Sequence, residues 1–154
     1  MSAVAMSPAQ ADFSSGLPPG ARILVTGGSG FIGTNLVGAY RAAGLTVRNA
    51  DMAQPRNTLD SDAWSRVDIT RIDQLRAVFS EVRPTHVVHL AARTDFDGRE
   101  VSDYAANTTG VGNLLTVLAE APDPVERAVI ASSRLVCRIG YQPGFDEDHC
   151  PTTA

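Results

Sequence analysis

One short segment constrains the fold of this chain more than any other: the glycine-rich sequence TGGSGFIG at residues 26–33. It follows an apolar run at residues 22–26 that is typical of a buried strand. It also opens a stretch, residues 31–43, whose apolar residues recur at helical spacing. A glycine-rich turn between a strand and a helix suits the pyrophosphate of a dinucleotide, because the backbone can approach the phosphates and the helix N-terminus carries a partial positive charge.

The glycines of this loop have different expected tasks. Gly27 suits the tight turn out of the strand, Gly30 lets the backbone approach the pyrophosphate, and Gly33 lets the helix pack closely against the sheet. The same letters also fit a motif that begins at Gly28, so the sequence leaves open which residue makes the turn; we favour Gly27. The candidate cofactor-binding residues of the loop are Gly27, Gly30, Phe31, Ile32 and Gly33.

Strands and helices alternate along the rest of the chain. Gly44 follows the first predicted helix, where a C-terminal cap is expected. Periodicity predicts helices over residues 71–82 and 101–121, a weak helix near Trp64, and strands over residues 45–51, 65–68, 85–91 and 127–132. This alternation implies right-handed crossovers between parallel strands. The expected fold class is therefore α/β, a Rossmann-type doubly wound parallel sheet of about five strands.

An acidic residue ends the second predicted strand, where dinucleotide-binding folds bind a ribose. Asp51 lies 18 residues after Gly33 (51 minus 33), and its carboxylate can accept hydrogen bonds from both ribose hydroxyls. Because it would repel a 2′-phosphate, NAD is favoured over NADP, although Arg48 and Arg56 are near enough in sequence to offset part of that charge. The alternative role for Asp51 is that of a turn former at the strand end.

Composition and charge exclude several other classes of protein. The 154 residues, 44% hydrophobic and 19% charged, suit one globular domain. We expect a disordered leader over residues 1–20, without signal-peptide features, and a dinucleotide-binding domain over residues 21–154. The net charge of -4 and the scattered arginines offer no basic patch to nucleic acid. No apolar run reaches the roughly 18 residues that span a membrane.

No metal site is expected. Cys137 and Cys150 fit neither a disulfide framework nor a metal motif, which favours a cytoplasmic location. His86 and His89 fall in one predicted strand, and we interpret them as lying on one face of it. No third ligand lies nearby in sequence, so a core or surface role is favoured for both. The acidic residues 146–148 are interpreted as a solvated loop.

Five motifs, in this order, resemble those of a known family. They are the glycine loop, Asp68-Ile69-Thr70, His89-Leu90-Ala91-Ala92, Asn107 within NTTGVGNLL, and Ser132-Ser133 after the fifth predicted strand. Together they resemble the extended short-chain dehydrogenases/reductases, the NAD-dependent epimerase/dehydratase group. The resemblance runs from about Arg22 to the last residue. It implies an NAD-dependent hydride transfer, commonly on a nucleotide-linked sugar.

The resemblance implies a role for each matching residue. Asp68 and Ile69 would contact the adenine ring, and Asn107 would help to organise the active site. Ser133 stands where the family has its catalytic Ser or Thr, which hydrogen-bonds the substrate. The strand end under the cofactor would be Leu90, Ala91 and Ala92, with Ser132 lining the nicotinamide side. Simpler alternatives stay open: a helix cap at Asp68-Ile69-Thr70, close packing at the alanines, a solvent-bonded Asn107, and a turn at the serines.

The sequence departs from the family pattern in the residues that carry the chemistry. Family members use a Tyr-x-x-x-Lys pair, in which the lysine lowers the pKa of the tyrosine. Here all 13 basic residues are arginine, and Tyr141 is followed by Gln-Pro-Gly-Phe. A second departure is Val136-Cys137-Arg138, where relatives commonly have Val-Tyr-Gly. We therefore interpret the chain as an amino-terminal portion that ends before the last helix, the last strands and the substrate lobe.

Three functional hypotheses follow from this interpretation. The chain is the cofactor half of an NAD-dependent epimerase, dehydratase or reductase that acts on a nucleotide-linked sugar. Alternatively, it is a catalytically silent module that binds NAD as a regulatory ligand, or an inactive fragment. Family members often form homodimers through helices of which one is missing here, so a homodimer of this chain is not expected.

Overall fold

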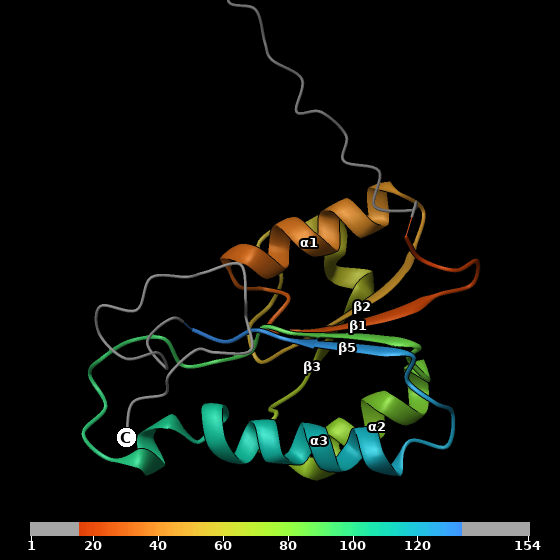
Figure 1. Ribbon diagram of the computed structural model, residues 1–154. Coiled ribbons are helices and arrows are strands. Elements are labelled where there is room, and N and C mark those ends of the chain that lie inside the picture. The colour runs from red at the N-terminus through yellow and green to blue at the C-terminus, as the bar shows by residue number, and fades with distance from the viewer. Residues whose placement is uncertain (1–15, 134–154) are drawn as a thin grey trace, which may run out of the picture.

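The computed structural model describes residues 16–133, which form three layers with a sheet in the middle (Figure 1). In chain order the elements are β1 (Arg22–Thr26), α1 (Phe31–Ala42), β2 (Thr46–Asp51), η1 (Thr58–Ala63), β3 (Trp64–Arg66), α2 (Ile72–Val82), β4 (His86–His89), η2 (Val101–Tyr104), η3 (Ala106–Gly110), α3 (Val111–Glu120) and β5 (Arg127–Ile130). Most of the leader, Tyr141 and the acidic trio lie outside the described residues.

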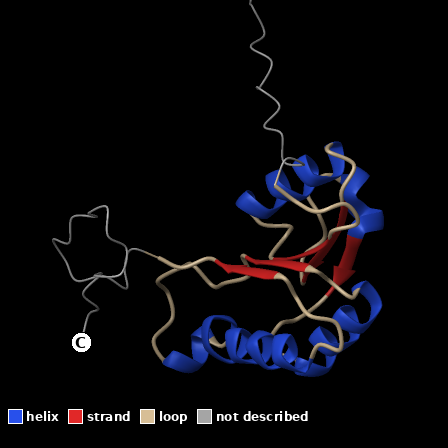
Figure 2. Cartoon of the chain, turned by 45° about the vertical axis from the view of Figure 1, so that its right-hand side comes forward, coloured by secondary structure: helices blue, strands red, loops and turns tan. Residues whose placement is uncertain are grey.

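The five strands are all parallel, in the order β3-β2-β1-β4-β5. Helix α1 covers one face of the sheet, and α2 and α3 cover the other (Figures 1 and 2). Thr26 at the end of β1 is level with Ala50 of β2 and with His89 of β4. This arrangement confirms the predicted Rossmann-type fold. It also brings the carboxyl ends of β1, β2 and β4 to one edge of the sheet.

Two apolar clusters hold the layers together. On the α2 and α3 side, Leu24 and Leu75 are both 0% exposed and pack with Leu114 of α3. On the α1 side, Ile23 and Val25 pack against Val37. Successive residues of β1 thus alternate between the two clusters, as the period of a strand requires. The strand is buried on both faces, and this explains its continuous apolar sequence.

The ends of the first two helices follow the expected signals. Gly44 has φ +74° and donates its N–H to the carbonyl of Arg41, which closes α1 at the predicted cap. Helix α2 ends in a left-handed residue, Arg83, with φ +48°, directly before Pro84. The weak helix predicted near Trp64 corresponds to η1, a 3-10 helix that ends at Ala63, and Trp64 itself opens β3.

The long helix predicted over residues 101–121 is divided into three parts. A 3-10 turn, η2, is followed by a π-helical turn, η3, and only residues 111–120 are α-helical. The change occurs where Gly110 packs directly on the side chain of Ile69 and where the Asn107 side chain bonds the backbone of Arg93. Both contacts join distant segments, so helical periodicity alone does not reveal them.

The expectation that His86 and His89 share one face of β4 is wrong. Val87 packs in the cluster toward α2 and α3, whereas Val88 packs on the α1 side. Residues three apart in a strand point to opposite faces, so His89 lies on the face of Val87 and His86 on that of Val88. None of the helices within residues 16–133 is long and apolar enough to cross a membrane.

Candidate functional site

A hollow of about 390 Å³ opens at the carboxyl edge of the sheet. The sequence-predicted residues that line it come from four segments: Gly27, Gly30, Asp51, Asp68, Ile69, Leu90, Ala91 and Ala92. The topology thus brings together the glycine loop, the end of β2, the segment after β3 and the end of β4. The predicted residues that do not line this hollow are Phe31, Ile32, Gly33, Asn107, Ser132 and Ser133.

Gly27 makes the turn out of β1. Its φ is +75°, a conformation that side chains rarely adopt. A Cβ there would lie 2.5 Å from the backbone N of Ala91 and 2.7 Å from the carbonyl carbon of Leu90. A Cβ on Gly33 would collide with the carbonyl oxygen of Gly27. The turn therefore belongs to Gly27, as favoured from the sequence, and the loop is pressed between β4 and α1.

The N-terminus of α1 directly follows this loop. Its N-cap is Gly30, which offers no side chain to cap the helix, and the first turn holds no acidic residue. The N–H groups of a first helical turn have no partners within the helix, so this end favours an anion. Phe31 and Ile32 are 77% and 64% exposed, so they lie outside the core at this helix end.

Asp51 faces the hollow from the end of β2. One carboxylate oxygen accepts the backbone N–H of Ser29 in the glycine loop at 3.0 Å, and the other accepts that of Ala53 at 2.9 Å. The second bond is the turn-forming contact considered as an alternative from the sequence. A carboxylate has about four acceptor positions, so accepting these two bonds leaves capacity for a pair of hydroxyl groups.

The segment after β3 lines the hollow with Asp68 and Ile69. Asp68 Oδ1 accepts the N–H of Thr70 at 2.9 Å and its hydroxyl at 2.7 Å. The alternative role of Asp68 as the cap of α2 is wrong, because the N-cap is Arg71 and no side chain caps it. Ile69 is buried under Gly110, which fixes this segment against the π-helical turn.

Asn107 acts on the segment that follows β4. Its Oδ1 accepts the N–H of Arg93 at 2.8 Å, and its Nδ2 donates to the carbonyl of the same residue at 2.9 Å. The amide side chain thus makes the same pair of hydrogen bonds to residue 93 that a neighbouring strand would make, although the two residues are 14 apart in sequence. The alternative of a solvent-bonded asparagine is wrong. By holding residue 93, Asn107 fixes the chain next to Ala91 and Ala92 at the hollow.

His89 is a buried residue behind the site. It is 2% exposed, and its Nδ1 lies 2.6 Å from the Thr26 hydroxyl oxygen. Burial lowers the pKa of the imidazole from its usual value of 6.5. As the pH falls, His89 therefore becomes protonated in the unfolded chain before it does so in the folded chain. Its contribution to the free energy of unfolding is present above pH 6.5 and is lost as the pH falls through the lowered pKa of the folded state. No metal-ligand group of three or more His, Cys, Asp or Glu residues occurs in residues 16–133.

Several residues of the hollow were missed from the sequence: Ala50, Met52, Val67, Thr70, Arg93 and Ala106. Each of the six is next in sequence to a predicted residue, so adjacency was a usable signal for all of them, including Arg93, which directly follows Ala92. Its guanidinium is held by Asp95 at 2.8 Å and lies 5.1 Å from the centre of the Tyr104 ring, and its hydrogen bond to Asp95 raises the pKa of Arg93.

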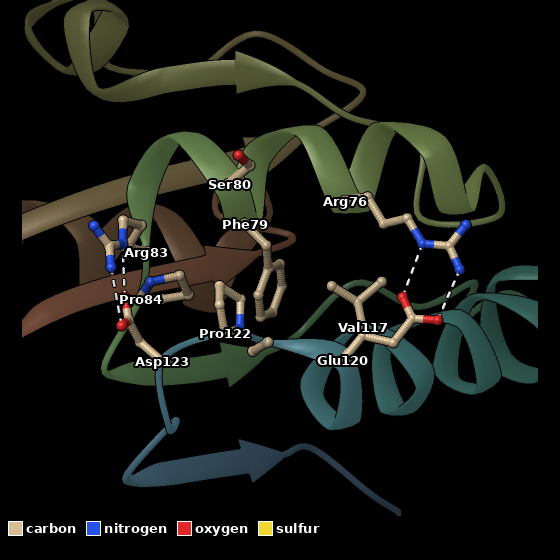
Figure 3. Close-up of a pocket in the computed structure, with 10 residues that line it drawn as sticks. Arg76, Phe79, Ser80, Arg83, Pro84, Val117, Glu120, Pro122 and Asp123 are labelled. Carbon is tan, nitrogen blue, oxygen red and sulfur yellow. Dashed lines mark hydrogen bonds and ion pairs between the residues drawn. The ribbon is translucent and has the colours of Figure 1, made fainter.

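A second hollow of about 450 Å³ lies between α2 and α3, near the amino ends of β4 and β5. Figure 3 shows the ring of Phe79 and the side chain of Val117 between two ion pairs. Arg76 binds Glu120 with two bonds of 2.8 Å, and Arg83 binds Asp123 at 2.6 and 2.9 Å. Both arginines of this hollow are thus paired with carboxylates. We interpret the two ion pairs as structural contacts that hold the α2 segment against the α3 segment.

The first hollow defines the class of protein. It is surrounded by a glycine turn pressed against the backbone that follows β4, an uncapped helix end and a strand-end carboxylate, an arrangement typical of Rossmann-type dinucleotide-binding domains. The sequence matches the NAD dependent epimerase/dehydratase family over residues 23–153. The chain therefore belongs to this family, as the five motifs indicated.

Comparison with individual proteins gives the same result. UDP-glucuronate 4-epimerase 6 of Arabidopsis thaliana is 31% identical over 147 residues, which cover 86% of this chain and 32% of that protein. UDP-glucose 4-epimerase of Thermus thermophilus, solved in complex with NAD, has a TM-score of 0.67 at 32% identity and matches 86% of this chain and 44% of its own. WbmG of Bordetella bronchiseptica, solved with NAD and UDP, has a TM-score of 0.70 at 27% identity, over 86% of this chain and 43% of its own. The chain spans about a third (31% and 32%) of the curated relatives it matches.

Proposed function

We propose that residues 21–154 form the NAD-binding portion of an NAD-dependent epimerase, dehydratase or reductase that acts on a nucleotide-linked sugar. The observation that carries this proposal is the meeting of Gly27, Gly30 and Asp51 at one hollow. Two of the named relatives support the substrate class, since they are epimerases of UDP-linked sugars. When bound, NAD supplies a nicotinamide ring that accepts or returns a hydride.

The residues present fit this cofactor. A side chain on Gly27 would meet the backbone that directly follows β4, and one on Gly30 would lie 3.3 Å from the Gly27 carbonyl oxygen, so the loop keeps a surface made of backbone. The uncapped first turn of α1 suits the pyrophosphate. The remaining acceptor positions of Asp51 suit the two hydroxyls of the adenosine ribose and would repel a 2′-phosphate.

The other predicted residues take their proposed roles from the family resemblance. Asp68 and Ile69 would contact the adenine, and the small residues Ala91 and Ala92 allow the cofactor to lie close to the end of β4. Asn107 holds the neighbouring backbone in place. For Ser133, which follows β5, we propose a hydrogen bond to the reacting hydroxyl or carbonyl of the substrate, and for Ser132 a place beside the nicotinamide.

Calorimetric titration with NAD tests the proposal. Asp51→Ala removes hydrogen bonds to a charged acceptor, each of which contributes about 1.5–3 kcal/mol, so we expect NAD affinity to fall by at least the effect of one of them, about 10- to 100-fold. Asp123→Ala is the matched control, because it removes the same charge at the opposite edge of the sheet. Equal NAD affinity in the Asp51 variant and the native chain would contradict the ribose assignment.

A second candidate function is NAD binding without catalysis. The family's tyrosine is activated by a lysine, and these 154 residues contain no lysine, so this candidate concerns what these residues do by themselves. For the purified chain we expect NAD binding without NADH formation from UDP-linked sugars, measured by NADH absorbance. Formation of NADH would exclude the silent module and show that another residue replaces the lysine.

A further inference from the structure

A buried amide lies in the middle of the sheet, at Asn49 of β2. It is 0% exposed, and the alternation of the strand places its side chain on the same face as Val47, toward α1. An amide in such a place destabilises a fold unless hydrogen bonds replace its contacts with water. An apolar residue would fill the position without this cost, so the amide indicates a task beyond packing.

Asn49 is joined to Asp51 through Ser29. Asn49 Nδ2 donates to Ser29 Oγ at 3.0 Å, and Ser29 Oγ donates to the carbonyl oxygen of Ala53 at 2.8 Å. The backbone N–H groups of Ser29 and Ala53 in turn donate to the two carboxylate oxygens of Asp51. We call these four hydrogen bonds the circuit. In it, the Asn49 amide orients the Ser29 hydroxyl, this hydroxyl joins the glycine loop to the backbone after β2, and the backbone N–H groups of both segments hold the Asp51 carboxylate.

The glycine loop also rests on the same amide. A Cβ on Gly28 would collide with the side chain of Asn49, so the loop backbone lies in direct contact with it. Ser29 is 6% exposed, and its oxygen both accepts one bond and donates another. The position of Asp51 therefore depends on a side chain that lies two residues earlier in the same strand and does not line the hollow.

We propose that Asn49 and Ser29 are positioning residues that set the preference for NAD over NADP; this rests on the proposed function of Asp51. A carboxylate held at both oxygens points its remaining acceptor positions at the ribose hydroxyls. It also cannot turn away from a 2′-phosphate, so the repulsion of NADP is retained. With the circuit broken, Asp51 gains rotational freedom, which weakens NAD binding and relieves the repulsion of NADP.

The proposal predicts that stability and selectivity change independently. Asn49 Oδ1 has no hydrogen-bond partner among the described residues, so Asn49→Val removes a poorly satisfied polar group and inserts a good strand former. We expect an unfolding midpoint equal to or above that of the native chain. The ratio of the dissociation constants for NADP and NAD should fall about two- to tenfold, the effect of one hydrogen bond.

The experiment measures that ratio and the unfolding midpoint in three variants. Ser29→Ala should lower the ratio like Asn49→Val, and the double variant should lower it no further, because both break one circuit. Val47→Ala is the matched control on the same face of β2, where the side chain is 9% exposed and packs against α1 without a polar contact. It should lower the midpoint and leave the ratio unchanged.

Failure of this inference can be told from failure of the proposed function. A native chain that binds neither nucleotide, or both equally, refutes the role of Asp51 and with it the role of Asn49. A native chain that prefers NAD, together with an unchanged ratio in Asn49→Val, refutes only the positioning role. An equal fall of the ratio in Val47→Ala would also refute it, since general loosening of β2 would then explain the effect.

Discussion

Gly27→Ala tests whether the turn after β1 is fixed by contact with β4. Two separate costs are expected from this one methyl group. The left-handed conformation at φ +75° costs an alanine about 1–2 kcal/mol relative to glycine. The Cβ would also lie 2.5–2.8 Å from backbone atoms of Leu90 and Ala91, and overpacking of this kind costs about 1–3 kcal/mol. The sum is about 2–5 kcal/mol.

Gly44→Ala separates these two costs. Gly44 has nearly the same φ, +74°, but a Cβ there meets nothing within 4 Å. Only the backbone cost of about 1–2 kcal/mol is therefore expected at this position. The difference between the two variants measures the contact with β4, because the conformational cost is common to both.

Urea denaturation followed by circular dichroism measures the free energy of unfolding of both variants. With a slope of about 2 kcal/mol per molar urea, a difference of about 2 kcal/mol moves the midpoint by about 1 M. Equal destabilisation by the two alanines would refute the reasoning, because the loop and the end of β4 would then be able to move apart. NAD affinity measured on the same Gly27 variant shows whether the hollow changes shape.

Three further predictions concern the sheet and its helices. Between about pH 7.5 and 5.5 the free energy of unfolding should fall less in His89→Gln than in the native chain, since one titrating group contributes at most about 1.4 kcal/mol per pH unit; equal slopes would show that His89 does not titrate differently on folding. Leu75→Ala, at a site that is 0% exposed, should cost about 2–5 kcal/mol, whereas Leu59→Ala, at 78% exposure, should stay within about 0.5 kcal/mol. Asn107→Ala should speed amide hydrogen exchange at residue 93, and unchanged exchange would mean that the two bonds do not hold that segment.

The local sequence was sufficient for the features that depend on neighbouring residues. The glycine loop, the cap at Gly44 and the carboxylate at the end of β2 each lie within a few residues of the element that they serve. Backbone conformation and alternation determine such features, and both can be predicted from sequence spacing. The parallel direction of the strands also followed, because strands that alternate with helices are joined by crossover connections.

The features that the sequence did not predict depend on contacts between distant segments. Asn107 reaches residue 93, and this contact accompanies the π-helical turn that interrupts the predicted helix. Asn49 lies 20 residues from Ser29, and nothing in the spacing of β2 marks it as more than a polar residue in a strand. Phe31 fitted the apolar helical pattern but is 77% exposed, because it lies in the first turn, beyond the part of α1 that packs on the sheet.

The strand order has a consequence for how the protein forms during synthesis. β1 is made first and lies in the centre, β2 and then β3 extend the sheet on one side, and β4 and then β5 extend it on the other. Each new strand therefore joins an edge that already exists, and none has to enter between two strands that are already paired. A domain that folds from its N-terminus as it leaves the ribosome can assemble this sheet in the order in which it is translated.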